Sequence, residues 1–134
     1  MSDPYEEIIH GERLLRLPLR PRHEEILGRL HRKIAACVAD LPTTRLLPPR
    51  SPVQVTPTTL LRPDLALLTA ANQKLWFVIE VVSSDDHHAD TVEKKSIYEE
   101  LRLPRLWMVD PRYDNVEVYH GTAHGLALKQ VLAG

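Results

Sequence analysis

Cysteine is nearly absent from this 134-residue sequence: Cys37 stands alone, which excludes an intrachain disulfide. No apolar run approaches the roughly 20 residues that a membrane-spanning helix needs, and the acidic N-terminus lacks the apolar core of a signal peptide. We therefore expect a cytoplasmic protein with no membrane partner. Repeats and low-complexity tracts are also absent, and the length suits one domain, residues 1–134, with its own hydrophobic core.

A large net charge is absent as well, since 17 Lys and Arg face 18 Asp and Glu, but the charges are unevenly distributed. Residues 13–62 hold ten Lys or Arg and three acids, a local charge of +7. The rest of the chain holds seven and fifteen, a local charge of −8. This asymmetry is compatible with a polyanionic partner. The simpler interpretation is a set of solvated arginines on a helix and loops.

Hydrophobic periodicity predicts a long helix over residues 22–40, with Pro21 suited to its first turn because a proline there loses no helical hydrogen bond. At about 100° per residue, one side of this helix is an apolar stripe. The stripe consists of Ile26, Leu27, Leu30, Ile34, Cys37 and Val38. The other side carries Arg22, Arg29, Arg32 and Lys33. His23 lies near the centre of the stripe, where a histidine is either a satisfied boundary residue or part of a site.

Short apolar segments predict a β-sheet against this helix. Ahead of the helix, residues 6–12 ("EEIIHGE") are interpreted as an acidic turn and residues 13–17 as a strand. After it, the proline-rich residues 41–57 are interpreted as a loop or edge. Further strands are predicted at residues 58–61, 64–68, 75–82, 105–109, 115–120 and 126–132, and a second helix at about residues 90–102. This pattern predicts an α+β (α/β-like) fold, in which the first helix packs on a mixed sheet with strands 64–68 and 75–82 as neighbours.

A charged residue interrupts the most apolar of these strands. In "LWFVIEVVSSDD", residues 75–86, the strand is apolar on both faces but contains Glu80. A buried carboxylate needs a partner or a raised pKa. Asp64 begins a neighbouring predicted strand, and paired carboxylates are the hard oxygen ligands that Mg²⁺ or Mn²⁺ prefers. Glu80 is therefore either a metal ligand or an edge residue paired with an arginine.

A lysine on the second predicted helix is positioned to meet these carboxylates. The inward arc of that helix is defined by Ile97, Tyr98 and Leu101. Lys94 falls within the arc, whereas Lys95 points about 100° away. A lysine on a buried face needs an anionic partner. Lys94 therefore either lies within about one water of Glu80 or extends past the edge of the core to solvent.

Five motifs follow one another along the chain: "YEEIIHGERL", "RHEEILGRL", "RPDLALL", "WFVIEVVSSDD" and "DTVEKKSIYEELRLPRLWMVDP". Together they resemble the Uma-two family of restriction endonucleases, which belongs to the PD-(D/E)XK nuclease superfamily. The resemblance covers roughly residues 5–120. It implies a single restriction-endonuclease-like domain that hydrolyses nucleic-acid phosphodiester bonds with Mg²⁺ or Mn²⁺ as cofactor.

The resemblance assigns roles to individual residues. Pro63-Asp64 matches the PD element and Glu80 the (D/E) element, and the backbone carbonyl of Val81 is a further metal ligand. Glu12, in "HGE", resembles an additional N-terminal acid of the family that supports the metal or a second ion. His23 matches a frequent family histidine.

The lysine of the superfamily pattern is displaced. Its usual position, two residues after the (D/E) element, is Val82 here. In the family the lysine lies instead on the following helix, four residues before a tyrosine, and Lys94 and Tyr98 have this spacing. By the resemblance, Lys94 is the catalytic lysine and Tyr98 an accessory residue.

The resulting hypothesis is a metal-dependent endonuclease in which Lys94 orients or deprotonates the attacking water or stabilises developing charge. Its expected partners are nucleic acid, in particular DNA, and a second copy of the chain in a homodimer with Trp107 and Tyr119 at the interface. The DNA phosphates would meet Arg29, Arg32 and Lys33, without reading of the base sequence.

Two alternatives remain open. The first alternative is a non-catalytic nucleic-acid-binding or protein-interaction module that keeps the nuclease fold. The absence of the strand lysine, replaced by Val82, motivates it. A transition-metal site at His87 and His88 with Asp86 and Asp90 is a weaker hypothesis, because neighbouring loop histidines are usually solvated.

Overall fold

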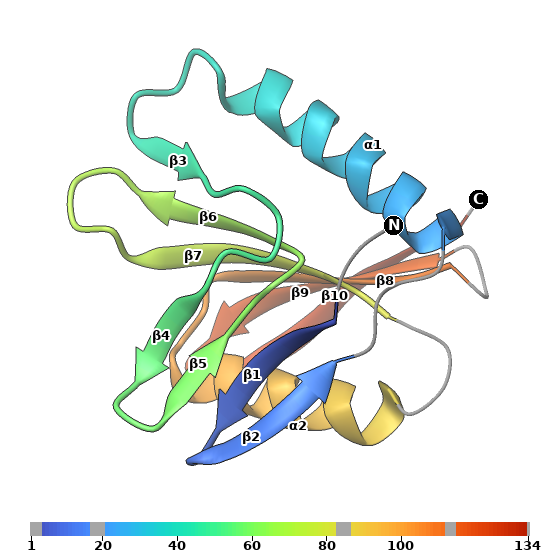
Figure 1. The fold of residues 1–134 in the computed structure, drawn as a ribbon. Coiled ribbons are helices and arrows are strands. Elements are labelled where there is room, and N and C mark those ends of the chain that lie inside the picture. The colour runs from blue at the N-terminus through green and yellow to red at the C-terminus, as the bar shows by residue number, and fades with distance from the viewer. Residues whose placement is uncertain (1–3, 17–20, 83–86, 112–114, 134) are drawn as a thin grey trace.

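The computed structural model describes residues 4–16, 21–82, 87–111 and 115–133. These residues form two helices and ten strands (Figure 1). The helices are α1 (Pro21–Val38) and α2 (His87–Glu100). The strands are β1 (Tyr5–Ile9), β2 (Glu12–Arg16), β3 (Thr44–Leu46), β4 (Val53–Thr56), β5 (Thr59–Leu61), β6 (Leu65–Thr69), β7 (Leu75–Val81), β8 (Arg105–Asp110), β9 (Asn115–Thr122) and β10 (Gly125–Ala133). Neither of these helices is long and apolar enough to span a bilayer.

A six-stranded sheet with the order β10-β9-β8-β7-β6-β3 forms the centre of the fold. It is mixed, because β7 and β8 are parallel while the other neighbours are antiparallel. α2 connects β7 to β8, as parallel neighbours require a crossover. β6 pairs with β7, with Leu65 opposite Ile79. The predicted adjacency of segments 64–68 and 75–82 and the mixed α+β architecture are thus confirmed.

One face of this sheet is covered by α1 (Figure 1). Leu27, which is 3% exposed, packs with Leu65, Ile79 and Val81 in a buried cluster that also holds other apolar residues of α1. The amphipathic stripe that the sequence predicted for this helix is the reason for this packing. The first helix therefore packs on the sheet as expected.

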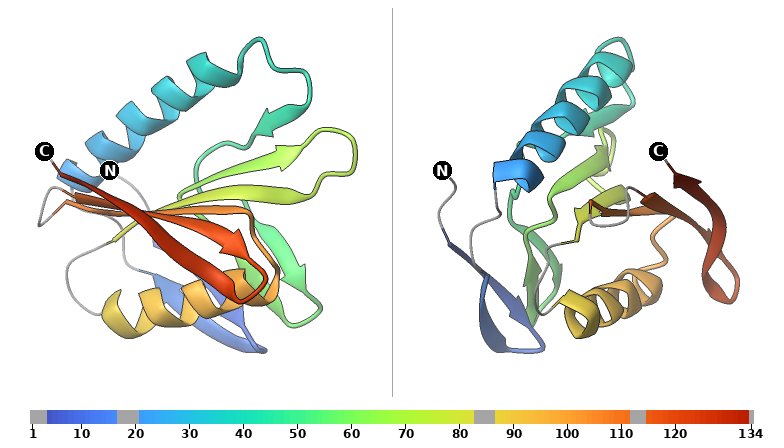
Figure 2. Two further views of the ribbon diagram at one scale, coloured as in Figure 1. Left: turned by 180° about the vertical axis from the view of Figure 1, so that it is seen from behind. Right: turned by 90° about the vertical axis from the view of Figure 1, so that its right-hand side faces the viewer.

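The opposite face is covered by α2 and by a second sheet of four strands with the order β2-β1-β5-β4 (Figure 2). Because successive side chains of a strand point to opposite faces, Val78 and Glu80 of β7 point to this side, away from α1. Val78 belongs to the larger buried cluster, which joins the six-stranded sheet to α2 and to β1 and β5. The candidate acid in the middle of β7 therefore faces the layer that contains α2.

Three side chains lie elsewhere than predicted. Cys37, which was predicted to belong to the apolar stripe of α1, is exposed. Tyr119 is buried in the larger cluster, and Trp107 packs edge-on against Phe77 on the α1 side, with 5.2 Å between ring centroids. Trp107 and Tyr119 therefore fill opposite faces of the sheet and do not form one exposed dimer surface.

The N-terminal segment also differs from its prediction as an acidic turn. Residues 5–9 form β1, which pairs with β2 in a hairpin closed by His10 and Gly11. Both turn residues have positive φ, 51° and 82°. Two-residue hairpin turns require this conformation, because its twist matches that of the flanking strands. The "HG" dipeptide alone forms the turn, so the two glutamates before it belong to a strand.

Differences elsewhere are smaller. β3 and β4 lie within residues 41–57, which were predicted as a loop or edge, and both are short strands that end their sheets. α1 and α2 end two residues before their predicted C-terminal bounds, and α2 begins three residues before its predicted start.

Candidate active site

Asp64 and Glu80 converge at one end of the six-stranded sheet. Asp64 directly precedes β6, and continuing the Leu65–Ile79 register places it opposite Glu80 on β7. Both side chains are buried, with exposed fractions of 4% and 5%. The Val81 backbone N–H donates a 2.7 Å hydrogen bond to Asp64 Oδ2. The polypeptide therefore holds one oxygen of Asp64 in place and leaves the other, Oδ1, for a further partner.

Glu80 is held by two residues of α2. The Tyr98 hydroxyl donates a 2.6 Å hydrogen bond to Glu80 Oε2, and Lys94 Nζ lies 3.6 Å from the same oxygen. Burial, together with the negative charges of Asp64 and Glu7, raises the pKa of Glu80 to about 8, although Lys94 and the Tyr98 hydroxyl lower it. Burial also raises the pKa of Asp64, against the lowering effects of Lys94, the Val81 amide and Arg50. For both acids, the effect of burial on the pKa therefore outweighs that of the nearby positive charges.

Lys94 lies where the helical wheel placed it. It is 5% exposed, and its Nζ is 2.8 Å from Glu7 Oε1 as well as 3.6 Å from Glu80 Oε2. Lys95 is half-buried on another side of the helix, 3.5 Å from Glu99 and over the ring of Tyr119. The expected proximity of Lys94 to Glu80 is therefore observed. Lys95 is separate from the acids, although it is less solvated than expected.

Glu7 is the residue of this cluster that sequence reasoning missed. Its side chain is completely buried. Besides Lys94, it accepts hydrogen bonds from Arg16 Nε (2.8 Å) and from the Arg62 backbone N–H (2.7 Å). Burial raises the pKa of Glu7, but Lys94, the Arg62 amide and Arg16 together lower it below its ordinary value. Glu7 is thus an anion with its oxygens occupied, suited to holding Lys94 in position.

Glu12, which was predicted to be the N-terminal acid of the site, is exposed at the open side of the hairpin turn, opposite Ile9. That prediction rested on the resemblance of "HGE" to the family's N-terminal acid. The hairpin instead directs Tyr5, Glu7 and Ile9 to the same, inward face of β1. The "HG" dipeptide is the sequence signal for the two-residue hairpin turn, but "YEEII" has no alternation of apolar and polar residues that would single out Glu7.

Arg50 is a second residue that the sequence did not single out. Its Nε lies 3.4 Å from Asp64 Oδ1, and its Nη2 makes a closer ion pair with Glu24 in the first turn of α1. The guanidinium also lies over the ring of Tyr5, 5.5 Å from the centroid. Burial and the charge of Asp64 raise the pKa of the Tyr5 hydroxyl. Arg50 thereby joins the N-terminal end of α1 to the candidate acids.

Of the remaining predicted residues whose side chains the structure describes, four lie on α1 and Val82 lies in the hydrophobic core. His23 is buried, with 5% exposure, at the N-terminal end of α1. Exposed positions on α1 are occupied by Arg29, Arg32 and Lys33. Val82, which stands at the usual position of the superfamily lysine, is buried in the same apolar cluster as Tyr98. It therefore supplies no charged group to the site. The proposed ligands His87 and His88, with Asp86 and Asp90, fall outside the side chains that the structure describes.

The donor set fits a divalent cation. Asp64 and Glu80 supply carboxylate oxygens, and burial raises the pKa of both, so a cation between them would offset part of the cost of keeping them charged. Among the described residues there is no group of three or more His, Cys, Asp or Glu side chains arranged for a metal. A metal ion would therefore be held by these two carboxylates and the backbone carbonyl of Val81. So few protein ligands suit a magnesium ion, which keeps several of its waters.

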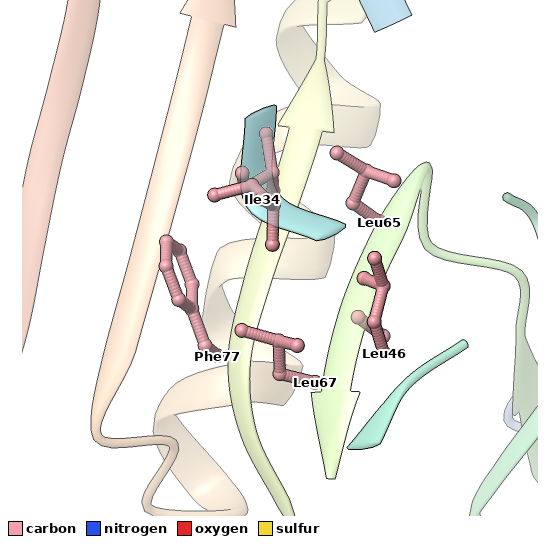
Figure 3. Close-up of a pocket in the computed structure, with 7 residues that line it drawn as sticks. Ile34, Leu46, Leu65, Leu67 and Phe77 are labelled. Carbon is pink, nitrogen blue, oxygen red and sulfur yellow. The ribbon is translucent and has the colours of Figure 1, made fainter. Parts of the chain in front are cut away.

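An apolar pocket elsewhere has a different character. Figure 3 shows Ile34 of α1 above residues of β3, β6 and β7. The pocket is lined by Ile34, Leu46, Leu65, Ala66, Leu67, Phe77 and Ile79. It lies on the sheet face that α1 covers, and no charged side chain lines it. It therefore belongs to the packing of α1 and offers no group for catalysis.

Known proteins resemble this chain in sequence pattern and in fold. The sequence model of Uma2, described as "Putative restriction endonuclease", matches residues 2–134. A crystal structure from Anabaena variabilis ATCC 29413, described as a "putative nuclease belonging to DUF820", matches 99% of this chain and 79% of its own, with a TM-score of 0.78 and 16% identity. The cryo-electron microscopy structure of a DrdV–DNA complex matches 82% of this chain and 10% of its own, with a TM-score of 0.55 and 14% identity. At these identities the likeness concerns the fold. No curated protein gave a match.

Proposed function

The chain belongs to the Uma2 family, described as "Putative restriction endonuclease", and from this premise we propose that it is a metal-dependent endonuclease acting on nucleic-acid phosphodiester bonds. One observation carries the proposal: Asp64, Glu80 and Lys94 meet in a buried cluster although they come from three separate segments of the chain. Burying two acids and a lysine is costly for stability. Such groups are concentrated at functional sites, so their presence here favours a catalytic role.

Asp64 Oδ1, a carboxylate oxygen of Glu80 and the backbone carbonyl of Val81 are the groups that would hold Mg²⁺ or Mn²⁺. Such an ion, when bound, polarises the scissile phosphate and lowers the pKa of an attacking water. The Tyr98 hydroxyl fixes Glu80 Oε2. The Val81 amide fixes Asp64 Oδ2. The two acids are therefore oriented before any ligand arrives, which reduces the cost of assembling the site.

Lys94 supplies the ammonium group of the site. Its Nζ is held by Glu7 at 2.8 Å and lies 3.6 Å from Glu80. From this position it would donate hydrogen bonds to the attacking water or to a phosphate oxygen as negative charge develops there. Glu7 acts as a positioning residue, because it contacts the lysine and not the substrate.

The proposed substrate is nucleic acid, DNA in particular. Arg29, Arg32 and Lys33 are exposed on α1 and would contact phosphates irrespective of base sequence. Arg29 is ion-paired with the exposed Glu25 at 2.7 Å, so a phosphate would have to replace Glu25 there. The proposed assembly is a homodimer, the arrangement that would bring two such sites to the two strands of a duplex.

The test is a calorimetric titration of the metal-free protein with Mg²⁺ and Mn²⁺, followed by cleavage assays on supercoiled plasmid, single-stranded DNA and RNA. Wild type should bind one ion at the acids, and Asp64→Asn should lose both binding and cleavage. Asp40→Asn, at an exposed position after α1, is the matched control and should change neither. Metal binding or cleavage that survives Asp64→Asn would refute the proposed site.

A non-catalytic nucleic-acid-binding or protein-interaction module is the second candidate. The observation in its favour is that Lys94 Nζ is nearer to Glu7 than to Glu80, so the lysine is paired without any substrate. This candidate predicts no cleavage of any of the three substrates. In its nucleic-acid-binding form it also predicts DNA binding that is unaffected by Mg²⁺ and by Asp64→Asn.

A further inference from the structure

We propose that Arg50 is a built-in competitor of the metal ion for Asp64, and that Glu24 controls the competition by drawing the Arg50 guanidinium away. This inference rests on the proposed function, since it concerns the affinity of the same carboxylate for Mg²⁺ or Mn²⁺. It adds two positioning residues, Arg50 and Glu24, that lie outside the nuclease motif.

The competition is for a single atom. Asp64 Oδ2 accepts the 2.7 Å hydrogen bond of the Val81 amide, which leaves Oδ1 as the oxygen available to a cation. Arg50 Nε is directed at that oxygen, at 3.4 Å. A divalent ion at Oδ1 would lie beside the guanidinium, and two positive charges at such a separation repel strongly in a buried site. Metal binding therefore requires Arg50 to give up this contact.

Arg50 is held firmly in the position from which it competes. Its backbone N–H lies 3.1 Å from the Pro63 carbonyl and 3.3 Å from the Asp64 carbonyl, so its main chain is attached to the same segment as the acid. Its φ of 56° is a conformation that non-glycine residues rarely adopt and that the surrounding contacts must maintain. The guanidinium lies over the Tyr5 ring. Withdrawal from Asp64 thus has to come from the side chain, not from a movement of the segment.

Glu24 provides the alternative partner. Its carboxylate makes the closer of the two ion pairs with Arg50, and its side chain is 33% exposed, whereas that of Asp64 is 5% exposed. The guanidinium is therefore shared between a half-exposed acid and a buried one. In the structure Arg50 contacts both acids at once, so Glu24 competes with Asp64 for the guanidinium. A shift of the guanidinium further toward Glu24 would free Oδ1 of Asp64 for a metal, whereas without Glu24 Arg50 would pair with Asp64 alone.

The experiment titrates metal-free protein with Mn²⁺ alone, by calorimetry, in wild type, Arg50→Gln, Glu24→Gln and the double variant. Arg50→Gln should bind Mn²⁺ about 10-fold tighter or more, the factor that corresponds to loss of one hydrogen bond between charged groups. Glu24→Gln should bind it about 10-fold weaker. In the double variant the effect of Glu24→Gln should disappear, because Glu24 acts through Arg50. Arg45→Gln, which removes an exposed arginine at β3, is the control and should match wild type.

Three results would overturn the inference. Wild-type or weaker affinity in Arg50→Gln, with binding still lost in Asp64→Asn, would reject the competition and leave the proposed function standing. An equal effect of Glu24→Gln in both backgrounds would show that Glu24 acts through its own charge alone. A wild-type protein that binds no Mn²⁺ would refute the inference and the proposed metal dependence together. Glu24→Gln alters a half-exposed side chain, so it remains informative if Arg50→Gln fails to fold.

Discussion

Replacing Glu7 by glutamine tests the centre of the charged network. The Glu7 carboxylate is fully buried and accepts hydrogen bonds from Lys94 and Arg16 at Oε1 and from the Arg62 amide at Oε2. A glutamine keeps one acceptor and turns the other into a donor, so its amide nitrogen must face at least one of these donors. Lys94 also loses the anion nearest to it.

The expected loss of stability is large. Removing one charge of a buried ion pair costs about 3–5 kcal/mol, since the remaining charge stays buried without compensation. The free energy of unfolding of a natural domain is about 5–15 kcal/mol. Glu7→Gln should therefore lose a substantial part of it. With roughly 4 °C per kcal/mol for a chain of this length, the melting temperature should fall by about 10–20 °C.

The measurement is urea unfolding, with Glu12→Gln as the matched control on the same hairpin. Glu12 is exposed, so its replacement should change the free energy of unfolding by less than about 0.5 kcal/mol. The folded-state pKa of Glu7 lies below its ordinary value of 4.5, so its contribution is present above that value and is lost as the pH falls through the lower, folded-state pKa. The difference between wild type and Glu7→Gln should therefore persist from pH 8 to pH 5 and narrow in more acidic solution. Similar small losses for both variants would contradict the assignment of Glu7 as the buried anion.

Further predictions concern catalysis, protons and salt. Lys94→Met should reduce cleavage by about 100-fold or more while Asp64 and Glu80 still bind metal, and Lys95→Met should leave cleavage unchanged, as plasmid cleavage and calorimetry would show. Mg²⁺ should displace about one proton at pH 7, because the pKa of Glu80 is about 8 without metal. Affinity should therefore rise with pH up to about 8 and then level off, and calorimetry in two buffers of different ionisation enthalpy would detect the proton. Replacing Arg29, Arg32 and Lys33 together by glutamine should lower the salt dependence of DNA binding by about three phosphate contacts; an unchanged slope would show that these residues are only solvated.

The parts of the fold that the sequence predicted are those governed by periodicity. α1 has a helical stripe long enough to be distinguished from a strand, and β6 and β7 are apolar on both faces because each is covered on both sides. β3 and β4 lack such a signal, since three- and four-residue strands at the end of a sheet need only one neighbour. The N-terminal hairpin was missed because the span of its turn, two residues, was overestimated.

The candidate site was predictable where one element carried the information. The helical periodicity of α2 places Lys94 and Tyr98 on its inward face, and this can be predicted without knowing their partners. Glu80 is conspicuous because it is the charged residue of an otherwise apolar strand. Glu7 and Arg50 carry no such local signal. Their significance comes from partners at sequence separations that only the folded chain brings together, 87 residues between Glu7 and Lys94 and 26 between Glu24 and Arg50.

The uneven charge of the sequence takes a different meaning in the folded chain. Arg16 and Arg50, from the basic segment 13–62, lie against Glu7 and Asp64, so part of that segment is the counter-charge of buried acids. Arg32 and Lys33 remain exposed on α1, which covers the sheet face opposite Glu80. A nucleic acid that contacts both α1 and the acids would therefore have to pass the N-terminal end of α1, where Glu24 meets Arg50. A phosphate at that point would compete with Glu24 for the guanidinium, so substrate and metal would affect each other's binding through the same arginine.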